Sequence, residues 1–306
     1  MNFELTAPAK SARISLSSSS VIVSVDVNVW TATKQDRTIS NEVTTLKNAS
    51  ADAGKFTKNL LANCPQHKAL LNYRQTIYNW LQRCTYDWAG AMRLLPLIRI
   101  EQFRKELDEH KVSFNKLLDD FCARYPSLVS DAAFKQGDMF DRSAYPDVQI
   151  VRGRFRITEM ISQVPENDFR SNIASVIAED LSKHYERQTE QIVETVMADA
   201  AERLVTIAER ISSACSEPEP SDEDGKKVKR KKVYESTISQ AREICDVLKE
   251  FNLTGNSQLE KARSQLDEAL RDVTLEDLRE STYVRSKVKG NVDDMLSKFK
   301  PLRSFA

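Results

Sequence analysis

The strongest local pattern in the chain is an alternation of valines with other residues near its start. The valines are Val21, Val23, Val25, Val27 and Val29, and most of the residues between them are polar. A period of two with β-branched residues on one face predicts a strand over residues 21–30. Because a lone strand is not stable, it needs a partner, and the candidates are residues 13–17 and 156–164.

After Trp30 the apolar residues take helical spacing almost to the end of the chain. This spacing predicts short helices over residues 36–47 and 52–61, a longer helix that begins at Pro65, and a helix from residue 100 that Pro126 stops. In the last of these, a coiled-coil seam has steps of three and four residues: Ile100, Phe103, Leu107, His110, Phe114, Leu117 and Phe121.

The longest periodic segment covers residues 172–215, with apolar residues mostly four apart. A helix of this length would span roughly 65 Å and needs another helix along it. The natural partner covers residues 234–251 and ends at the turn around Gly255, and further helices are predicted over residues 257–271 and 282–298. An antiparallel helical hairpin is the simplest assembly.

These patterns predict a mainly α-helical protein with a small α+β head, a sheet of two or three strands and a long antiparallel helical hairpin. The predicted parts are a flexible lead-in, a head with a helical bundle, the hairpin with a charged tip at 217–232, and C-terminal helices that pack back; they cover residues 1–19, 20–171, 172–251 and 252–306.

Composition removes several classes of function. Only seven of the 306 residues are glycine, where average usage would give roughly twenty. Their spacing excludes the glycine-rich loops that cradle nucleotide phosphates in G-x-G-x-x-G and G-x-x-x-x-G-K-[ST] motifs. No window approaches the roughly 18 apolar residues of a membrane span, and the first ten residues lack the pattern of a secretory signal. We expect a cytoplasmic protein without membrane contact.

Candidate chemistry is sparse. The five cysteines are widely spaced and are interpreted as buried thiols, and no histidine pair has metal-ligand spacing. His110 lies in an apolar seam and is interpreted as a hydrogen-bonded packing residue, with a ligand or pH switch as the alternative. His184, near Glu179, Asp180 and Glu186, resembles half of a helical metal site but lacks a second E-x-x-H element. We therefore predict no catalytic residue, metal or cofactor.

The sharpest anomaly is the charge of the predicted tip. Five acidic residues are followed at once by six bases: Lys226, Lys227, Lys229, Arg230, Lys231 and Lys232. Such a basic run can contact phosphates. The adjacent acids cancel much of its field, and Tyr234 is the only nearby aromatic residue for base stacking. We favour a solvated tip over a site for nucleic acid or an acidic partner.

Several motifs recur in a fixed order over roughly residues 21–298: Val27–Ala32, Asp36–Arg37, Asp52–Gly54, Tyr125–Pro126, Tyr145–Asp147, Arg152, Arg154–Phe155, Val164–Pro165, Asp168–Arg170 and Asn252–Gly255. In this order they resemble a family of uncharacterised phage and proteobacterial proteins, known as a domain of unknown function. The family is often encoded beside a MoxR-type AAA+ ATPase and a von Willebrand A-domain protein. Its members tend to have a short tip where this chain has the charged linker.

The resemblance implies a phage or bacterial cytoplasmic protein that works with the ATPase pair, and it transfers no catalytic residue. It draws attention to Arg152, Arg154 and Arg170 around the second strand candidate. These arginines could hold an acidic partner loop or pair with carboxylates of the chain itself, and we favour the second reading.

Two functions are therefore expected. The first is a non-enzymatic adaptor or regulator of a MoxR-like ATPase, since long helices with separate seams suit protein contacts and homo-oligomers. The alternative is a phage protein that binds nucleic acid through the basic tip and the arginines.

Overall fold

The computed structural model describes residues 16–165, 175–216 and 233–299, and it is mainly α-helical with two small sheets. The chain divides into two compact units. Unit 1 consists of Met1–Val23, Thr85–Ile100 and Ile161–Ala306, and unit 2 consists of Ser24–Cys84 and Glu101–Met160. The segment Thr85–Ile100, within the predicted head, thus belongs to the same unit as the C-terminal helices. Of the predicted lead-in, residues 1–15 lie outside the described residues.

The main sheet is built around the valine-rich strand. Its strand order is β4-β5-β1-β6, with β1 at Ser20–Asn28, β4 at Tyr86–Asp87, β5 at Arg93–Pro96 and β6 at Arg156–Gln163. The predicted strand and its pairing with residues 156–164 are confirmed. The sheet has four strands instead of two or three, because β5 pairs antiparallel with β1 and β4 with β5. Leu16–Ser19 forms the short helix α1, so the alternative partner is wrong over residues 16–17.

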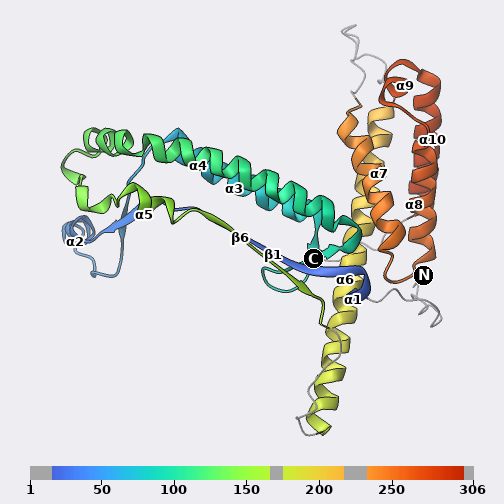
Figure 1. Ribbon diagram of the computed structural model, residues 1–306, viewed down its shortest axis with the longest axis horizontal. Helices are drawn as coiled ribbons and strands as arrows, with labels where there is room; N and C mark the ends of the chain where they lie inside the picture. The colour runs from blue at the N-terminus through green and yellow to red at the C-terminus, as the bar shows by residue number, and fades with distance from the viewer. Residues whose placement is uncertain (1–15, 166–174, 217–232, 300–306) are drawn as a thin grey trace. The chain divides into compact units, whose positions relative to one another are not determined.

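Helices form most of unit 1 (Figure 1). They are α6 (Ser175–Cys215), α7 (Glu235–Glu250), α8 (Ser257–Leu270), α9 (Leu275–Glu280) and α10 (Thr282–Lys298), and η1 (Leu97–Arg99) is a short 3-10 turn. α6 packs against α7 and α10, and α8 packs against α7 and α10. Figure 1 shows α7 running antiparallel to the C-terminal half of α6. The predicted hairpin helices and C-terminal helices are confirmed, and α9 is an addition.

Polar contacts join the helices of unit 1 to one another and to β4. The Tyr86 ring stacks on Phe251, with ring centres 5.3 Å apart. The Arg203 guanidinium lies over the Tyr86 ring, 4.5 Å from its centre. Burial raises the pKa of Tyr86 to about 12. Ser212 on α6 donates to Asp293 on α10 over 2.5 Å, and Lys289 pairs with the same carboxylate. These contacts fix α6 between its neighbours.

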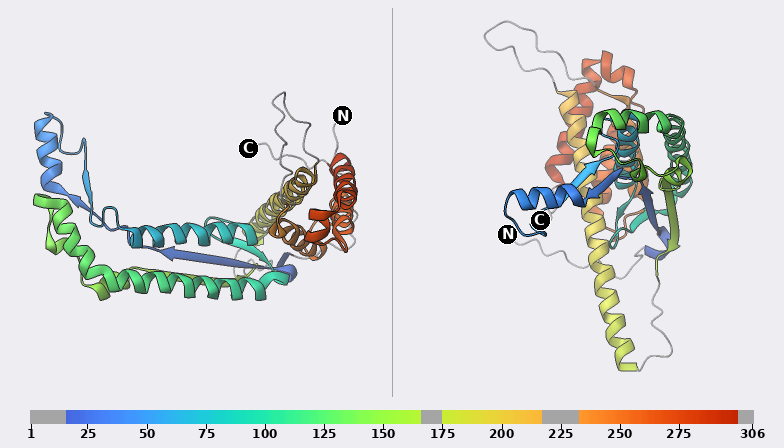
Figure 2. Two further views of the ribbon diagram at one scale, coloured as in Figure 1. Left: turned by 90° about the horizontal axis from the view of Figure 1, so that it is seen from above. Right: turned by 90° about the vertical axis from the view of Figure 1, so that its left-hand side faces the viewer.

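Unit 2 is organised by α3 (Pro65–Cys84) and α4 (Ile100–Gln136), whose first residue belongs to unit 1. Trp80 stacks on Phe103 and Tyr73 contacts His110, so residue numbers rise along α3 as they fall along α4. The two helices are therefore antiparallel, as Figure 2 shows. The Tyr73 hydroxyl lies 3.0 Å from Nδ1 of His110, and burial lowers the pKa of that half-buried histidine. His110 is thus a hydrogen-bonded packing residue, as interpreted.

Pro126 does not stop α4, which continues ten residues further to Gln136. Proline removes one backbone donor and crowds the preceding turn. Tyr125, Val129 and Ala132 remain buried on the continuing helix, and Tyr125 meets Trp30 edge to face at 6.3 Å. Tertiary packing of this apolar face outweighs the local penalty.

The helix predicted over residues 52–61 is wrong. Phe56–Asn59 forms strand β3, which pairs antiparallel with β2 (Thr33–Asp36) in a separate two-stranded sheet. Helix α2 (Arg37–Leu46) lies between these strands in sequence and confirms the helix predicted there. The remaining elements of unit 2 are η2 (Gly137–Met139), η3 (Arg142–Ala144) and α5 (Val148–Arg152), which Asp147 caps.

Candidate partner-binding platform

The predicted site residues fall into two groups. The six bases Lys226, Lys227, Lys229, Arg230, Lys231 and Lys232, together with Arg170, lie outside the described residues. Arg152 donates to Oδ1 of Asp119 over 2.5 Å, and this carboxylate raises the pKa of the arginine. The Arg154 guanidinium lies 5.5 Å from the ring centre of Trp30. Both described arginines thus have contacts within unit 2.

His184 and its acidic neighbours Asp180 and Glu186 are exposed on α6. No group of three or more His, Cys, Asp or Glu side chains in the described part of the chain could hold a metal ion. Across residues 16–165, 175–216 and 233–299, no helix combines the length and apolarity needed to cross a membrane.

The most unusual surface is on α2 in unit 2. Its apolar residues, Ile39, Val43 and Leu46, are four and three residues apart and form one stripe, which we call the apolar stripe. Val43 is 49% exposed and Leu46 is 79% exposed, whereas the buried residues of α2 are Ser40 and Thr44. A surface helix normally buries its apolar face. Here the polar side chains face inward, and Val43 and Leu46 face solvent while Ile39 is half-buried.

Hydrogen bonds explain the polar inner face. The Asp36 carboxylate caps α2 by accepting from the Ile39 amide over 3.2 Å. The Ser40 hydroxyl donates to the Asp36 carbonyl and accepts from the Phe56 amide over 2.9 Å. Thr44 donates to the Ser40 carbonyl over 3.0 Å. The inner face of α2 is therefore bonded to its own cap and to β3, and apolar residues there would leave these groups unpaired.

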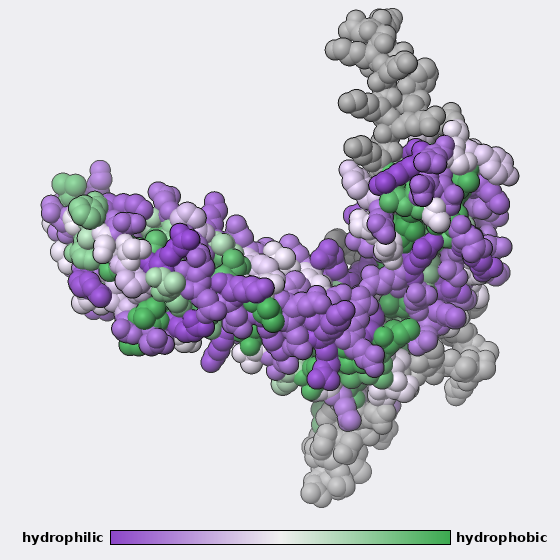
Figure 3. All heavy atoms as spheres, turned by 45° about the horizontal axis from the view of Figure 1, so that its top comes forward, coloured by the Kyte–Doolittle hydropathy of each residue, from purple (hydrophilic) through white to green (hydrophobic). Residues whose placement is uncertain are grey.

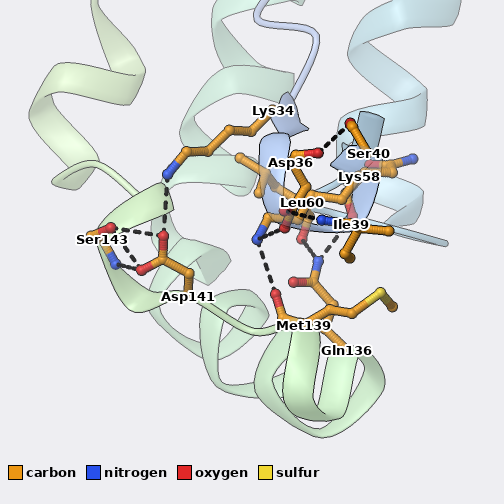
Figure 4. A network of polar contacts seen from close by, with 11 residues as sticks. Lys34, Asp36, Ile39, Ser40, Lys58, Leu60, Gln136, Met139, Asp141 and Ser143 are labelled. Carbon is orange, nitrogen blue, oxygen red and sulfur yellow. Dashed lines mark hydrogen bonds and ion pairs between the residues drawn. The ribbon is translucent and has the colours of Figure 1, made fainter. Parts of the chain in front are cut away.

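Lys58 on β3 fastens this segment to η2, directly after the end of α4. Its side chain is only 8% exposed, and its ammonium donates to the Met139 carbonyl over 2.9 Å and to Oδ2 of Asp36 over 3.3 Å (Figure 4). Gln136 also donates to the Asn59 carbonyl over 2.9 Å. We call β2, α2 and β3, residues 33–59, the platform, because these bonds hold the apolar stripe in place.

A second, more exposed ion pair lies beside Lys58 in the same network (Figure 4). Lys34 on β2 lies 3.2 Å from Asp141, and both side chains are about half exposed. Hydrogen bonds from Ser143, then the bond from Lys34, lower the pKa of Asp141 to about 2. This pair ties the platform to the segment that follows α4.

Other apolar side chains are exposed in the same part of unit 2. Phe56 starts β3, Phe134 lies in the last turn of α4, and Met139 lies in η2, next to the Lys58 contact. Figure 3 shows hydrophobic residues, in green, at the left-hand end, where α2 and the last turns of α4 lie. Sequence reasoning found α2 but missed this surface, although the serine and threonine at positions 40 and 44 were visible as a second, polar stripe.

No family model, curated protein or solved structure matches this chain.

Proposed function

We propose that the protein is a non-enzymatic adaptor that acts through helical contacts with other proteins. The observation that carries this proposal is the exposure of Val43 and Leu46 on a helix whose polar inner side, with the neighbouring Lys58, is fixed by part-buried hydrogen bonds. A contiguous apolar surface of this kind is typical of protein interaction sites. Because the platform is already ordered, a partner would not have to order it on binding.

The partner that we propose is a MoxR-like AAA+ ATPase, together with or instead of a von Willebrand A-domain protein. This part of the proposal comes from the family resemblance, and the platform supports only the coarser idea of a protein contact. An adaptor of this kind needs surfaces for recognition and no catalytic group. Its proposed setting is the cytoplasm of a bacterium, or of the host if the gene belongs to a phage.

Co-purification tests the proposal. The tagged protein, treated with nuclease, should capture the ATPase encoded beside its gene. Replacing Val43 and Leu46 by serine should reduce capture by at least about tenfold, because each apolar side chain contributes about 1.5–3 kcal/mol when it is buried. Val112→Ser is the matched control, since Val112 is 55% exposed on α4, outside the platform. Equal capture by all variants would remove the platform from the proposal, and no capture by the unchanged protein would reject the ATPase.

The second candidate is nucleic-acid binding through the run of bases at 226–232. It predicts a mobility shift with DNA or RNA that weakens steeply with salt, because each phosphate contact releases counterions. Neutralising the six bases with glutamine should abolish the shift and leave ATPase capture unchanged. Binding that does not depend on salt would reject this candidate.

A further inference from the structure

Two opposite charges flank the apolar stripe of α2. Successive helical residues are about 100° apart around the axis, which places Glu42 about 70° to one side of the stripe and Lys47 about 70° to the other. Lys47 is the C-cap residue, and both side chains are exposed. In heptad terms Ile39, Val43 and Leu46 take the d, a and d positions, and Glu42 and Lys47 take g and e.

From this arrangement we infer that a second copy of the chain covers the stripe, with the two α2 helices packed in parallel about a two-fold axis. The inference rests on the proposed function, because it names the molecule that lies directly against the platform. An ATPase would then bind the pair of chains, and serine at Val43 and Leu46 would weaken its capture by separating the pair.

Charge complementarity selects both the occupant and the orientation. In a parallel pair the g residue of one helix faces the next e residue of the other, so Glu42 of each copy meets Lys47 of its mate. The two-fold axis makes this ion pair twice. An antiparallel pair centred on the stripe would instead place the two Glu42 carboxylates opposite each other, which is unfavourable. The same sequence therefore matches itself in only one of the two orientations.

The body of unit 2 leaves room for this pairing. Ser40 and Thr44, which mark the side of α2 that faces the rest of the unit, lie about 110° around the helix from the stripe. A two-fold axis through the stripe would direct the two bodies away from each other. The polar inner face thus has two effects. It bonds α2 to β3, and it leaves the apolar stripe at the outer side of unit 2.

The expected dimer is weak. A stripe of three residues on a helix of ten residues buries far less than the roughly 800 Å² per partner of a standard interface. We therefore expect a dissociation constant of about 10 µM to 1 mM.

Sedimentation velocity of the purified full-length chain over this concentration range tests the inference. Leu46→Ser should weaken dimerisation about a hundredfold, because it removes a leucine from both sides. Glu42→Lys and Lys47→Glu should each weaken it about tenfold, since two attractive pairs become repulsive. The double variant E42K/K47E should restore it, and an equimolar mixture of the two single variants should form a heterodimer. Asn41→Lys, on the far side of α2, is the control and should have little effect.

A chain that stays monomeric up to about 1 mM overturns the inference. So does a dimer that neither charge variant weakens, because its contact would lie elsewhere. The outcomes separate this inference from the proposed function: ATPase capture by a monomeric protein rejects only the dimer, and a charge-sensitive dimer that captures no ATPase rejects only the adaptor role.

Discussion

Replacing Lys58 by alanine should loosen the platform. The lysine is almost fully buried, and its ammonium is the donor for the Met139 carbonyl. A hydrogen bond from a charged donor contributes about 1.5–3 kcal/mol, and the substitution also leaves an acceptor without its partner. We expect the free energy of local opening of the platform to fall by about 2–3 kcal/mol, which corresponds to about 30- to 150-fold faster exchange of its amide hydrogens.

Hydrogen exchange followed by mass spectrometry measures this effect segment by segment. Peptides that cover α2 and β3 should exchange faster in Lys58→Ala, and peptides from the middle of α3 should not change. Lys34→Ala is the matched control, because the Lys34–Asp141 pair lies in the same network but is about half exposed, and such pairs contribute little. Equal exchange in the two variants would refute the view that buried Lys58 holds the platform.

Three further predictions test other parts of the structure. Leu204 is fully buried in unit 1. Leu204→Ala should lower the free energy of unfolding by about 3 kcal/mol, as measured by urea titration. Burial lowers the pKa of His110 below its ordinary value of 6.5, so the folded protein favours the neutral form. The stability from this preference should be complete above pH 6.5 and be lost as pH falls from there through the lower pKa of the folded state. Thermal melts of the protein and of His110→Gln compare this effect. A hydrogen bond from the Ile39 amide, and then the contact with Lys58, lower the pKa of Asp36 below 3.8. The stability that its charge contributes is therefore present above that pH and lost in acid. Asp36→Asn should remove this part of the increase in amide hydrogen exchange of α2 as the pH falls.

Periodicity predicted the helices well where packing follows the pattern. The seam residues Phe103, Leu107, Phe114 and Phe121 are buried, and so is the long series from Val196 to Cys215, because an apolar stripe on a long helix has few other ways to leave water. Burial differs from the pattern at Leu117, which is half-buried while Leu118 is buried, and at Leu181, which is exposed. Pro126 shows the limit of a local rule. Its penalty is real, but Trp30, far away in sequence, supplies a contact for Tyr125 that no local pattern contains.

The short strands could not be predicted for a related reason. β3 consists of four residues, its only buried side chain is that of Lys58, and its only apolar side chain, Phe56, is exposed. It therefore lacks the alternation that marks a half-buried strand. Its place is set by partners more than a dozen residues away: β2, the Ser40 hydroxyl and the Met139 carbonyl. A strand of this kind exists only because its tertiary contacts do.

The same contacts explain why the platform was not foreseen. The spacing of Ile39, Val43 and Leu46 alone predicts a buried face, since apolar stripes are normally turned inward. What turns this one outward is the hydrogen-bonding need of β3, whose Phe56 amide requires an acceptor that Ser40 supplies. A serine and a threonine four residues apart on a short helix therefore indicate which face of the helix is buried. When the hydroxyls of such a pair satisfy buried backbone groups, the polar face turns inward and the apolar stripe remains at the surface for a partner.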